Sequence, residues 1–160
     1  YLLGHERSNA SYNAIIKRNL NKLKAIAGTE GADCGALSAE PTFRAKIADL
    51  EQELLTLEMT PLRTLPASAA DRPIGPEASI LKLRTAEVFK RAHELMMEAG
   101  AYYAQPFEPA AIRAGWNEEP VGPDYLFRMA PDYFESRAMS IPGGSNEVQK
   151  NIIAKAVLGL

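Results

Sequence analysis

Cysteine, long apolar runs and signal-like segments are scarce or missing in this sequence. Cys34 is the single cysteine among 160 residues, so no disulfide can form within the chain. A thiol without a partner favours a reducing compartment, and we therefore expect a cytoplasmic protein. No apolar run approaches the ~20 residues that span a bilayer, and no stretch resembles a signal peptide. The sequence predicts no membrane association.

A strong charge excess of either sign is also lacking. The formal net charge is −2. Nucleic acids and anionic membranes attract basic surfaces, so neither is expected as a partner. The histidines, His5 and His93, lie far apart in the sequence and lack carboxylate or thiol companions at ligand spacing. No metal site is predicted.

Strand signals are nearly absent, whereas apolar residues recur at helical spacing. With 46% hydrophobic residues, the chain can bury the core of one soluble domain. The first helix is expected from about Leu2 to Ala27, and glycines follow it. The residues expected near one face of this helix are Leu3, Ala10, Ala14, Leu20 and Leu23. The chain starts at Tyr1, at the beginning of this expected helix and without a methionine, and we expect it to be a piece of a longer protein.

Two further long helices are expected. Pro41 is well placed to begin one of them, and Pro61 is expected to kink or fray its end. Its apolar residues repeat at 4-3-4-3 spacing, which is typical of a helix-packing seam; they are Phe43, Ile47, Leu50, Leu54 and Leu57. The other helix follows Pro76 and stops near Gly100. Its heptad-like residues are Leu81, Val88, Ala92, Leu95 and Ala99.

The last third of the chain is more broken. Residues 102–123 are expected to form a long irregular excursion, and residues 124–139 a shorter helix that Pro131 kinks or splits. A final amphipathic helix follows Gly143 and Gly144; it carries Val148, Ile152, Ile153 and Val157. The pattern predicts an all-α protein, an antiparallel four-helix bundle with an extra short helix and a C-terminal helix.

The glycine turn GGSNE, residues 143–147, has two interpretations. Glycines before a helix permit close backbone approach, and the free N–H groups of the first turn attract an anion or a polar ligand. Alternatively, the glycines form a hinge, Ser145 or Asn146 caps the helix, and Glu147 complements its dipole. On spacing alone the purely structural interpretation is favoured. The stretch GHERSNA, residues 4–10, is similarly open, because Glu6 beside Arg7 suits either a general base or a solvated ion pair.

Four stretches together resemble the C-terminal helical domain of acyl-CoA dehydrogenases. They are LLGHERSNA, FRAKIADLEQELLTLEMTPLR, ASILKLRTAEVF and SRAMSIPGGSNEVQKNIIAKAVLGL. The resemblance covers essentially the whole chain and is strongest to a bacterial branch that includes steroid side-chain enzymes. It implies that residues 1–160 form one C-terminal bundle domain, and that an N-terminal helical domain and a middle β domain are absent from this chain.

The resemblance also implies chemistry. Enzymes of this family use FAD to remove hydrogen from the α and β carbons of an acyl-CoA thioester, and a carboxylate takes the α proton. Many members place this glutamate where Gly143 stands here. Another subset places it on the first helix before an arginine, where Glu6 and Arg7 stand, so Glu6 is the expected catalytic base.

The same resemblance assigns the glycine turn. Gly143 would hold the thioester carbonyl through its N–H, with Arg7 and Gly144 in substrate binding. Ser145 and Glu147 would lie near the flavin. Electron-transfer flavoprotein is the expected acceptor, β-oxidation of fatty acids the expected setting, and the bundle is expected to form a homo-tetramer or an α2β2 hetero-tetramer. This domain alone is expected to be inactive.

Three departures from the family pattern bear on these expectations. Pro142 replaces the usual aromatic residue before the glycines. An Arg-x-x-Phe-Gly stretch that reaches a neighbouring subunit's flavin is replaced by AIAGTEGADCGAL, and a glutamine-and-glycine segment by AQPFEPAAIRAGWNEE. These losses favour an unusual tetramer with fewer flavins than subunits. The alternatives are a non-catalytic subunit that completes a partner's site, or a helical assembly module.

Overall fold

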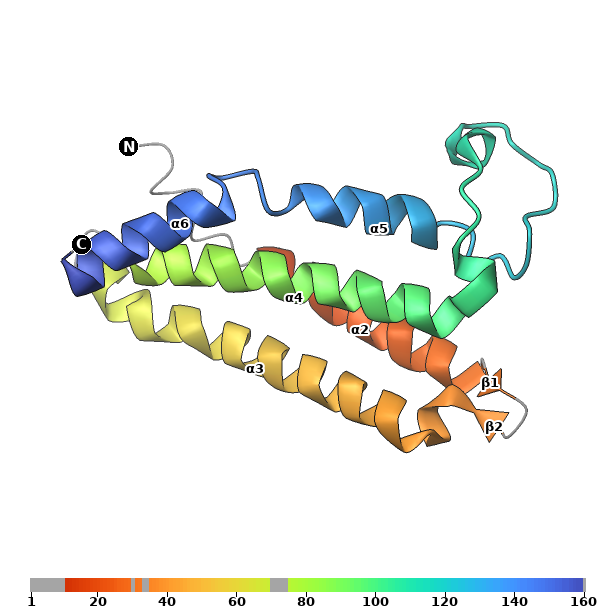
Figure 1. The fold of residues 1–160 in the computed structure, drawn as a ribbon, viewed down its shortest axis with the longest axis horizontal. Helices are drawn as coiled ribbons and strands as arrows, with labels where there is room; N and C mark the ends of the chain where they lie inside the picture. Colours follow the sequence, from red (N-terminus) through yellow and green to blue (C-terminus); the bar gives the residue numbers. More distant parts are fainter. Residues whose placement is uncertain (1–10, 30, 33–34, 70–74, 160) are drawn as a thin grey trace.

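A computed structural model describes residues 11–29, 31–32, 35–69 and 75–159 of the chain. These residues form an antiparallel bundle of long helices (Figure 1). The helices are α2 (Ser11–Thr29), α3 (Pro41–Ala69), α4 (Glu77–Gly100), α5 (Met129–Ala138) and α6 (Asn146–Ile153). In Figure 1, α5 and α6 run one after the other along α4, so together they make the fourth limb of the bundle. The all-α prediction is confirmed.

Strand structure in the described part is confined to a short ladder between α2 and α3. Strand β1 (Gly31–Ala32) pairs antiparallel with β2 (Gly35–Ala36). Within the same described ranges, no helix is both long enough and apolar enough to cross a membrane. Nor do these residues include a group of three or more His, Cys, Asp or Glu side chains that could hold a metal ion.

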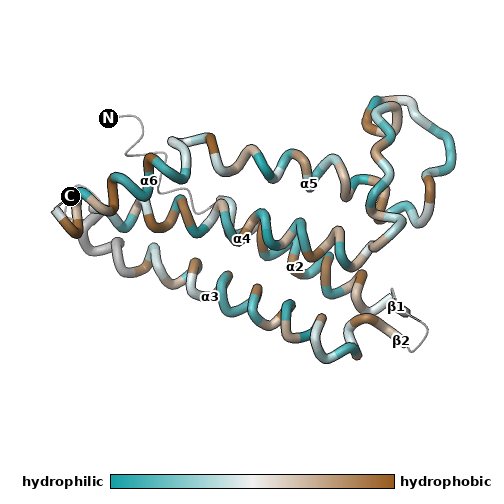
Figure 2. Tube along the Cα trace, in the orientation of Figure 1, coloured by the Kyte–Doolittle hydropathy of each residue, from teal (hydrophilic) through white to brown (hydrophobic). Residues whose placement is uncertain are grey.

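The apolar core lies where α2, α3 and α4 meet. Figure 2 shows apolar and polar residues alternating along the helices, as the periodicity of the sequence requires. All five seam residues of α3 and all five heptad-like residues of α4 are buried, which confirms both predictions. Leu20 and Leu23 of α2 are also buried, as expected. Ala14, which was expected on the same buried face, is exposed, and the nearby Ile16 is buried instead. Leu3 and Ala10 lie outside the described residues.

Helix α3 passes through Pro61 and ends at Ala69, so the prediction that the helix frays near this proline is wrong. A proline removes one N–H donor, and the turns on either side keep their own hydrogen bonds. Just before it, the hydroxyl groups of Thr56 and Thr60 donate to carbonyl oxygens one turn back, each over 2.8 Å. The local cost of the proline is outweighed by the buried seam that precedes it.

Helix α5 begins at Met129 rather than at Asp124, so this predicted boundary is also wrong. Pro131 is the third helical residue, and it neither kinks nor splits the helix. In the first turn of a helix the N–H groups have no intrahelical partner, so a proline loses nothing there. The preceding residues form turns around Leu126, which is fully buried. The irregular excursion before them is confirmed; it contains the 3-10 turns Ala101–Ala104 and Pro109–Ile112.

Candidate active site

The turn between α5 and α6 contains two glycines with left-handed backbone conformations. Gly143 has φ 68° and Gly144 has φ 91°, a region that residues with a β-carbon adopt at a cost. The space around the two differs. A β-carbon built on Gly143 meets no atom within 4 Å, whereas one built on Gly144 lies 2.7 Å from Nε2 of Gln149. The side-chain direction of Gly143 is therefore open, and that of Gly144 is filled.

The first turn of α6 is capped as the structural interpretation of the sequence predicted. The Ser145 hydroxyl oxygen accepts a hydrogen bond from the Val148 N–H over 3.4 Å. The pKa of the exposed Glu147 carboxyl is lowered, first by the N–H of Glu147 itself and then by the Ser145 hydroxyl. Ser145 and Glu147 are thus part of one cap. Glu147 remains accessible to a bound group, and the flavin contact expected for both residues stays a prediction.

Hydrogen bonds close the neck of the turn. The Asn146 N–H donates to the Ser140 carbonyl oxygen over 3.0 Å, and the Gln149 side chain donates from Nε2 to the Gly143 carbonyl oxygen over 2.9 Å. Among the described residues, the N–H group of Gly143 has no hydrogen-bond partner. The turn therefore offers one backbone donor, which suits an acceptor atom such as a carbonyl oxygen.

Helix α4 holds this turn with two lysines. Lys82 Nζ donates to Asn146 Oδ1 over 3.0 Å and lies 3.5 Å from the Met139 carbonyl oxygen. Lys90 Nζ donates to the Ser140 hydroxyl over 2.8 Å. Burial lowers the pKa of Lys82, and the Glu147 carboxylate partly opposes this effect. Hydrogen bonds from charged donors are stronger than neutral ones, so these contacts fix the turn against α4.

The buried face of α6 is polar. Asn146 and Gln149 are buried, whereas Val148 of α6 and Val157 beyond the end of this helix are 49% and 60% exposed. The sequence pattern indicated Asn146 only as a possible cap, and it gave no role to Gln149 or Lys82. Gln149 is visible locally as a polar residue among the apolar residues of the last helix. The pairing of Lys82 with Asn146 joins distant parts of the chain and leaves no local signal.

Two of the predicted site residues cannot be placed in this geometry. Glu6 and Arg7 lie outside the described residues, so their roles as catalytic base and substrate ligand stay predictions. Of the predicted set, the structure brings together Gly143, Gly144, Ser145 and Glu147, all within the one turn and cap.

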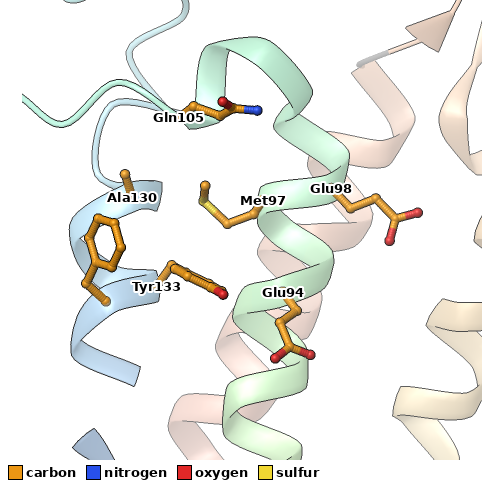
Figure 3. Close-up of a pocket in the computed structure, with 7 residues that line it drawn as sticks. Glu94, Met97, Glu98, Gln105, Ala130 and Tyr133 are labelled. Atoms are coloured by element: carbon orange, nitrogen blue, oxygen red, sulfur yellow. The ribbon is translucent and has the colours of Figure 1, made fainter. Parts of the chain in front are cut away.

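A hollow lies between the C-terminal half of α4 and the start of α5 (Figure 3). Its volume is about 500 Å³, and it is lined by Glu94, Met97, Glu98, Gln105, Ala130, Tyr133 and Phe134. Glu94 is paired with Arg137 over 2.7 Å, and Glu98, which points away from α5 in Figure 3, is paired with Lys46. Since both carboxylates are held by cations, this hollow is a poor candidate for proton abstraction.

The sequence profile of one protein family, described as "Acyl-CoA dehydrogenase, C-terminal domain", matches residues 1–158. A comparison with curated proteins found no match. Solved structures resemble the fold closely, and the chain spans a little over a third of their length.

Three of these structures illustrate the range. The prolyl acyl carrier protein oxidase AnaB has a TM-score of 0.77 and 17% identity, with 99% of this chain and 37% of that chain covered. A glutaryl-coenzyme A dehydrogenase in complex with glutaryl-CoA has a TM-score of 0.75 and 16% identity, covering 98% and 36%. The ChsE4-ChsE5 complex from Mycobacterium tuberculosis has a TM-score of 0.71 and 22% identity, covering 92% and 36%. At these identities the likeness shows the fold.

Proposed function

Because the chain belongs to the acyl-CoA dehydrogenase family, of which it is the C-terminal domain, we propose that it works as part of a longer FAD-dependent enzyme. The proposed reaction introduces a double bond between the α and β carbons of an acyl-CoA thioester. One observation carries this proposal within the structure: in the turn before α6, the Gly143 N–H has no partner among the described residues, and this glycine faces open space. A substrate carbonyl can approach such a backbone closely.

The chain's own contribution is to hold the thioester and to move one proton. The Gly143 N–H donates to the thioester carbonyl oxygen and stabilises the negative charge that develops there as the α proton leaves, and Gly144 beside it contributes to substrate binding. Glu6 accepts this proton as the general base. Arg7 contributes to substrate binding beside it. Bound FAD would supply the hydride-accepting chemistry at the β carbon, and Ser145 and Glu147 are the residues of this chain that would lie near it.

The placement of the base explains the glycine at position 143. Many related enzymes carry a glutamate at this position, and the open space beside Gly143 is where such a side chain would extend. A base on the first helix makes that glutamate unnecessary. It also leaves room beside the turn for a bulky acyl group, which accords with the resemblance to steroid side-chain enzymes.

The partners follow from the same proposal. Acyl-CoA is the substrate and electron-transfer flavoprotein the electron acceptor, in a cytoplasmic enzyme of fatty-acid or related β-oxidation. Exposed apolar residues on α3, among them Leu55, Met59 and Leu62, follow one another at helical spacing and suit burial against a sister subunit in a tetramer.

A second function is favoured by two observations. Two segments that contact flavin in the family are replaced in this sequence, and one structural neighbour is a complex of two different chains, ChsE4-ChsE5. The chain would then belong to a subunit of an α2β2 assembly that completes the flavin site of its partner without catalysing the reaction itself.

One substitution separates the two functions. In the full-length protein with its native partners, Glu6→Gln should abolish the bleaching of flavin by acyl-CoA and leave acyl-CoA binding intact, because the amide keeps the shape but cannot take a proton. The matched control is Glu119→Gln, an exposed position in the irregular excursion. Adding Gly143→Glu to the Glu6→Gln variant should restore part of the activity. Unchanged bleaching in Glu6→Gln would favour the non-catalytic subunit.

A further inference from the structure

The connection between α4 and α5 forms a groove that the proposed function does not use. It belongs to residues 101–128, which extend from the end of the bundle opposite α6 in Figure 1. The groove has a volume of about 210 Å³. Its apolar lining includes Trp116, Val121 and Phe127, and its acidic lining includes Glu108 and Glu118. Aromatic rings and carboxylates in one small groove restrict the chemistry of what can occupy it.

Contacts on both limbs of the connection hold the groove in a fixed shape. The Glu108 carboxylate accepts a hydrogen bond from the Ala110 N–H over 3.1 Å and so caps the 3-10 turn Pro109–Ile112. On the returning limb, Gly122 has φ 87° and lies close against Tyr103, because a β-carbon on this glycine would be 2.6 Å from Cδ1 of the ring. A groove that is already formed loses less conformational entropy when a ligand binds.

Two aromatic rings form one wall of the groove. Trp116 and Phe127 stack on each other, with ring centroids 6.0 Å apart and planes at 26°. Both side chains are only half-buried. An aromatic face attracts a cation, and the tryptophan ring does so most strongly. The planar guanidinium group of arginine also stacks flat on such a face, whereas the compact ammonium group of lysine cannot.

The carboxylates of the groove differ from those of the bundle. On α3, Glu51, Glu53 and Glu58 each pair with a lysine or an arginine of another helix. In the part of the chain that the structure describes, neither Glu108 nor Glu118 forms an ion pair. With four acidic and two basic residues, the connection carries a net charge of −2, which equals that of the whole chain. This charge complements a basic partner.

We propose that the groove is a docking site for an arginine side chain in a basic segment of a partner protein. The guanidinium group stacks on the wall formed by Trp116 and Phe127, and its N–H groups donate to the carboxylates of Glu108 and Glu118. The groove lies away from the glycine turn and shares no residue with it. The inference is therefore independent of the proposed function.

The test compares three labelled peptides that differ in one type of side chain. The first is fluorescein-labelled Arg-Ser-Arg-Ser-Arg, and the others carry lysine or neutral citrulline in place of each arginine. Fluorescence anisotropy, with the full-length protein as titrant, gives each dissociation constant. The arginine peptide should bind about two- to fivefold more tightly than the lysine peptide, which is the size of an exposed cation–π contact. The citrulline peptide should bind most weakly, because it keeps the shape and loses the charge.

Two variants separate the aromatic contact from the attraction between charges. Trp116→Leu removes the better ring and keeps every charge, so it should abolish the preference for arginine over lysine. Glu118→Gln keeps the rings and should weaken the binding of both charged peptides. The matched control is Phe134→Leu, which removes an exposed aromatic ring of α5 outside the groove. It should bind all three peptides as the wild type does.

Several results would overturn the inference. Equal binding of the arginine and lysine peptides by the wild-type protein would show a general attraction between charges, and this comparison needs no variant to fold. An arginine preference that survives Trp116→Leu, or that is lost in Phe134→Leu, would place the contact elsewhere. Failure to bind any of the peptides would exclude the docking site. Since none of these assays measures turnover, such a failure leaves the proposed function standing.

Discussion

Helix α4 has two packing faces of opposite chemistry. Toward α2 and α3 it presents apolar side chains such as Val88, Ala92 and Leu95. Toward α5 and α6 it presents Lys82 and Lys90, which bond to polar groups of the turn region. Apolar burial is strong but has little directional preference, whereas hydrogen bonds demand particular distances and angles. We infer that the first interface supplies most of the stability and the second supplies the geometry of the site.

The apolar interface should produce the largest effect when it is damaged. Leu50→Ala removes a side chain that is 0% exposed and leaves a cavity in the α2–α3–α4 core. We expect the free energy of unfolding to fall by about 2–5 kcal/mol. Chemical denaturation followed by circular dichroism measures this loss.

The matched control is Leu55→Ala on the same helix, where the side chain is 55% exposed. In an unassembled chain this change should stay within about 0.5 kcal/mol of the wild type. Equal losses for the two variants would contradict the assignment of stability to the α2–α3–α4 core.

The polar interface of α4 with the α5–α6 turn should show a smaller loss of stability when it is damaged. Asn146→Ala removes the acceptor of the Lys82 ammonium group, a hydrogen bond of 3.0 Å at a partly buried site. We expect a loss of about 1–2 kcal/mol in the free energy of unfolding. Lys82→Met should cost a similar amount, and denaturation of the two single variants and the double variant gives the coupling energy.

A coupling energy of about 0.5–1.5 kcal/mol is expected if the two side chains act as a pair. Purely additive losses would show that Lys82 and Asn146 contribute to stability independently of each other. Thermal melting of the same variants at two salt concentrations adds a check, because salt screens a bond from an ammonium group more than it affects apolar packing.

The smallest effect concerns a polar group within the apolar interface. His93 is buried, its Nδ1–H donates to the Phe89 carbonyl oxygen over 2.8 Å, and its Nε2 lies 3.4 Å from Asn19 Nδ2. Burial lowers the pKa of His93 below its ordinary value of 6.5. The folded state therefore binds fewer protons than the unfolded state, and stability is full above pH 6.5 and declines as the pH falls below it.

Denaturation midpoints measured between pH 8 and pH 5 test this dependence. The control is His93→Gln, which keeps a polar side chain at the site and removes the titrating group. We expect the variant to be less stable than the wild type at pH 8 and to lose less stability on acidification. An identical slope in both proteins would show that other groups cause the decline.

The sequence predicted the apolar interface of α4 well, and its polar interface with the α5–α6 turn poorly. The seam residues of α3 and the heptad-like residues of α4 were identified from spacing alone, because a period near 3.6 reports directly on which residues share a helix face. On α6 the same reasoning would place Val148 in the core, yet Gln149 is buried there instead. Apolar periodicity marks a face that avoids water, and such a face can serve a partner rather than the chain itself.

The site shows the same division. The cap at Ser145 and the glycine turn were visible as local patterns, since both depend on neighbouring residues. The hydrogen bonds from Lys82 and Lys90 were not, because they join residues far apart in the chain. The two prolines misled for a related reason: Pro61 and Pro131 were judged by residue type, while their effect depends on their position within a helix.

The spacing of the two lysines along α4 has a consequence for how this domain can change. Lys82 and Lys90 lie two turns apart, about 12 Å along the helix axis, and reach from either side toward the neck of one turn. Inserting a single residue between them would rotate one lysine by about 100° relative to the other. This stretch of α4 should therefore reject insertions and deletions, and length variation among related chains should fall in the connections between the helices.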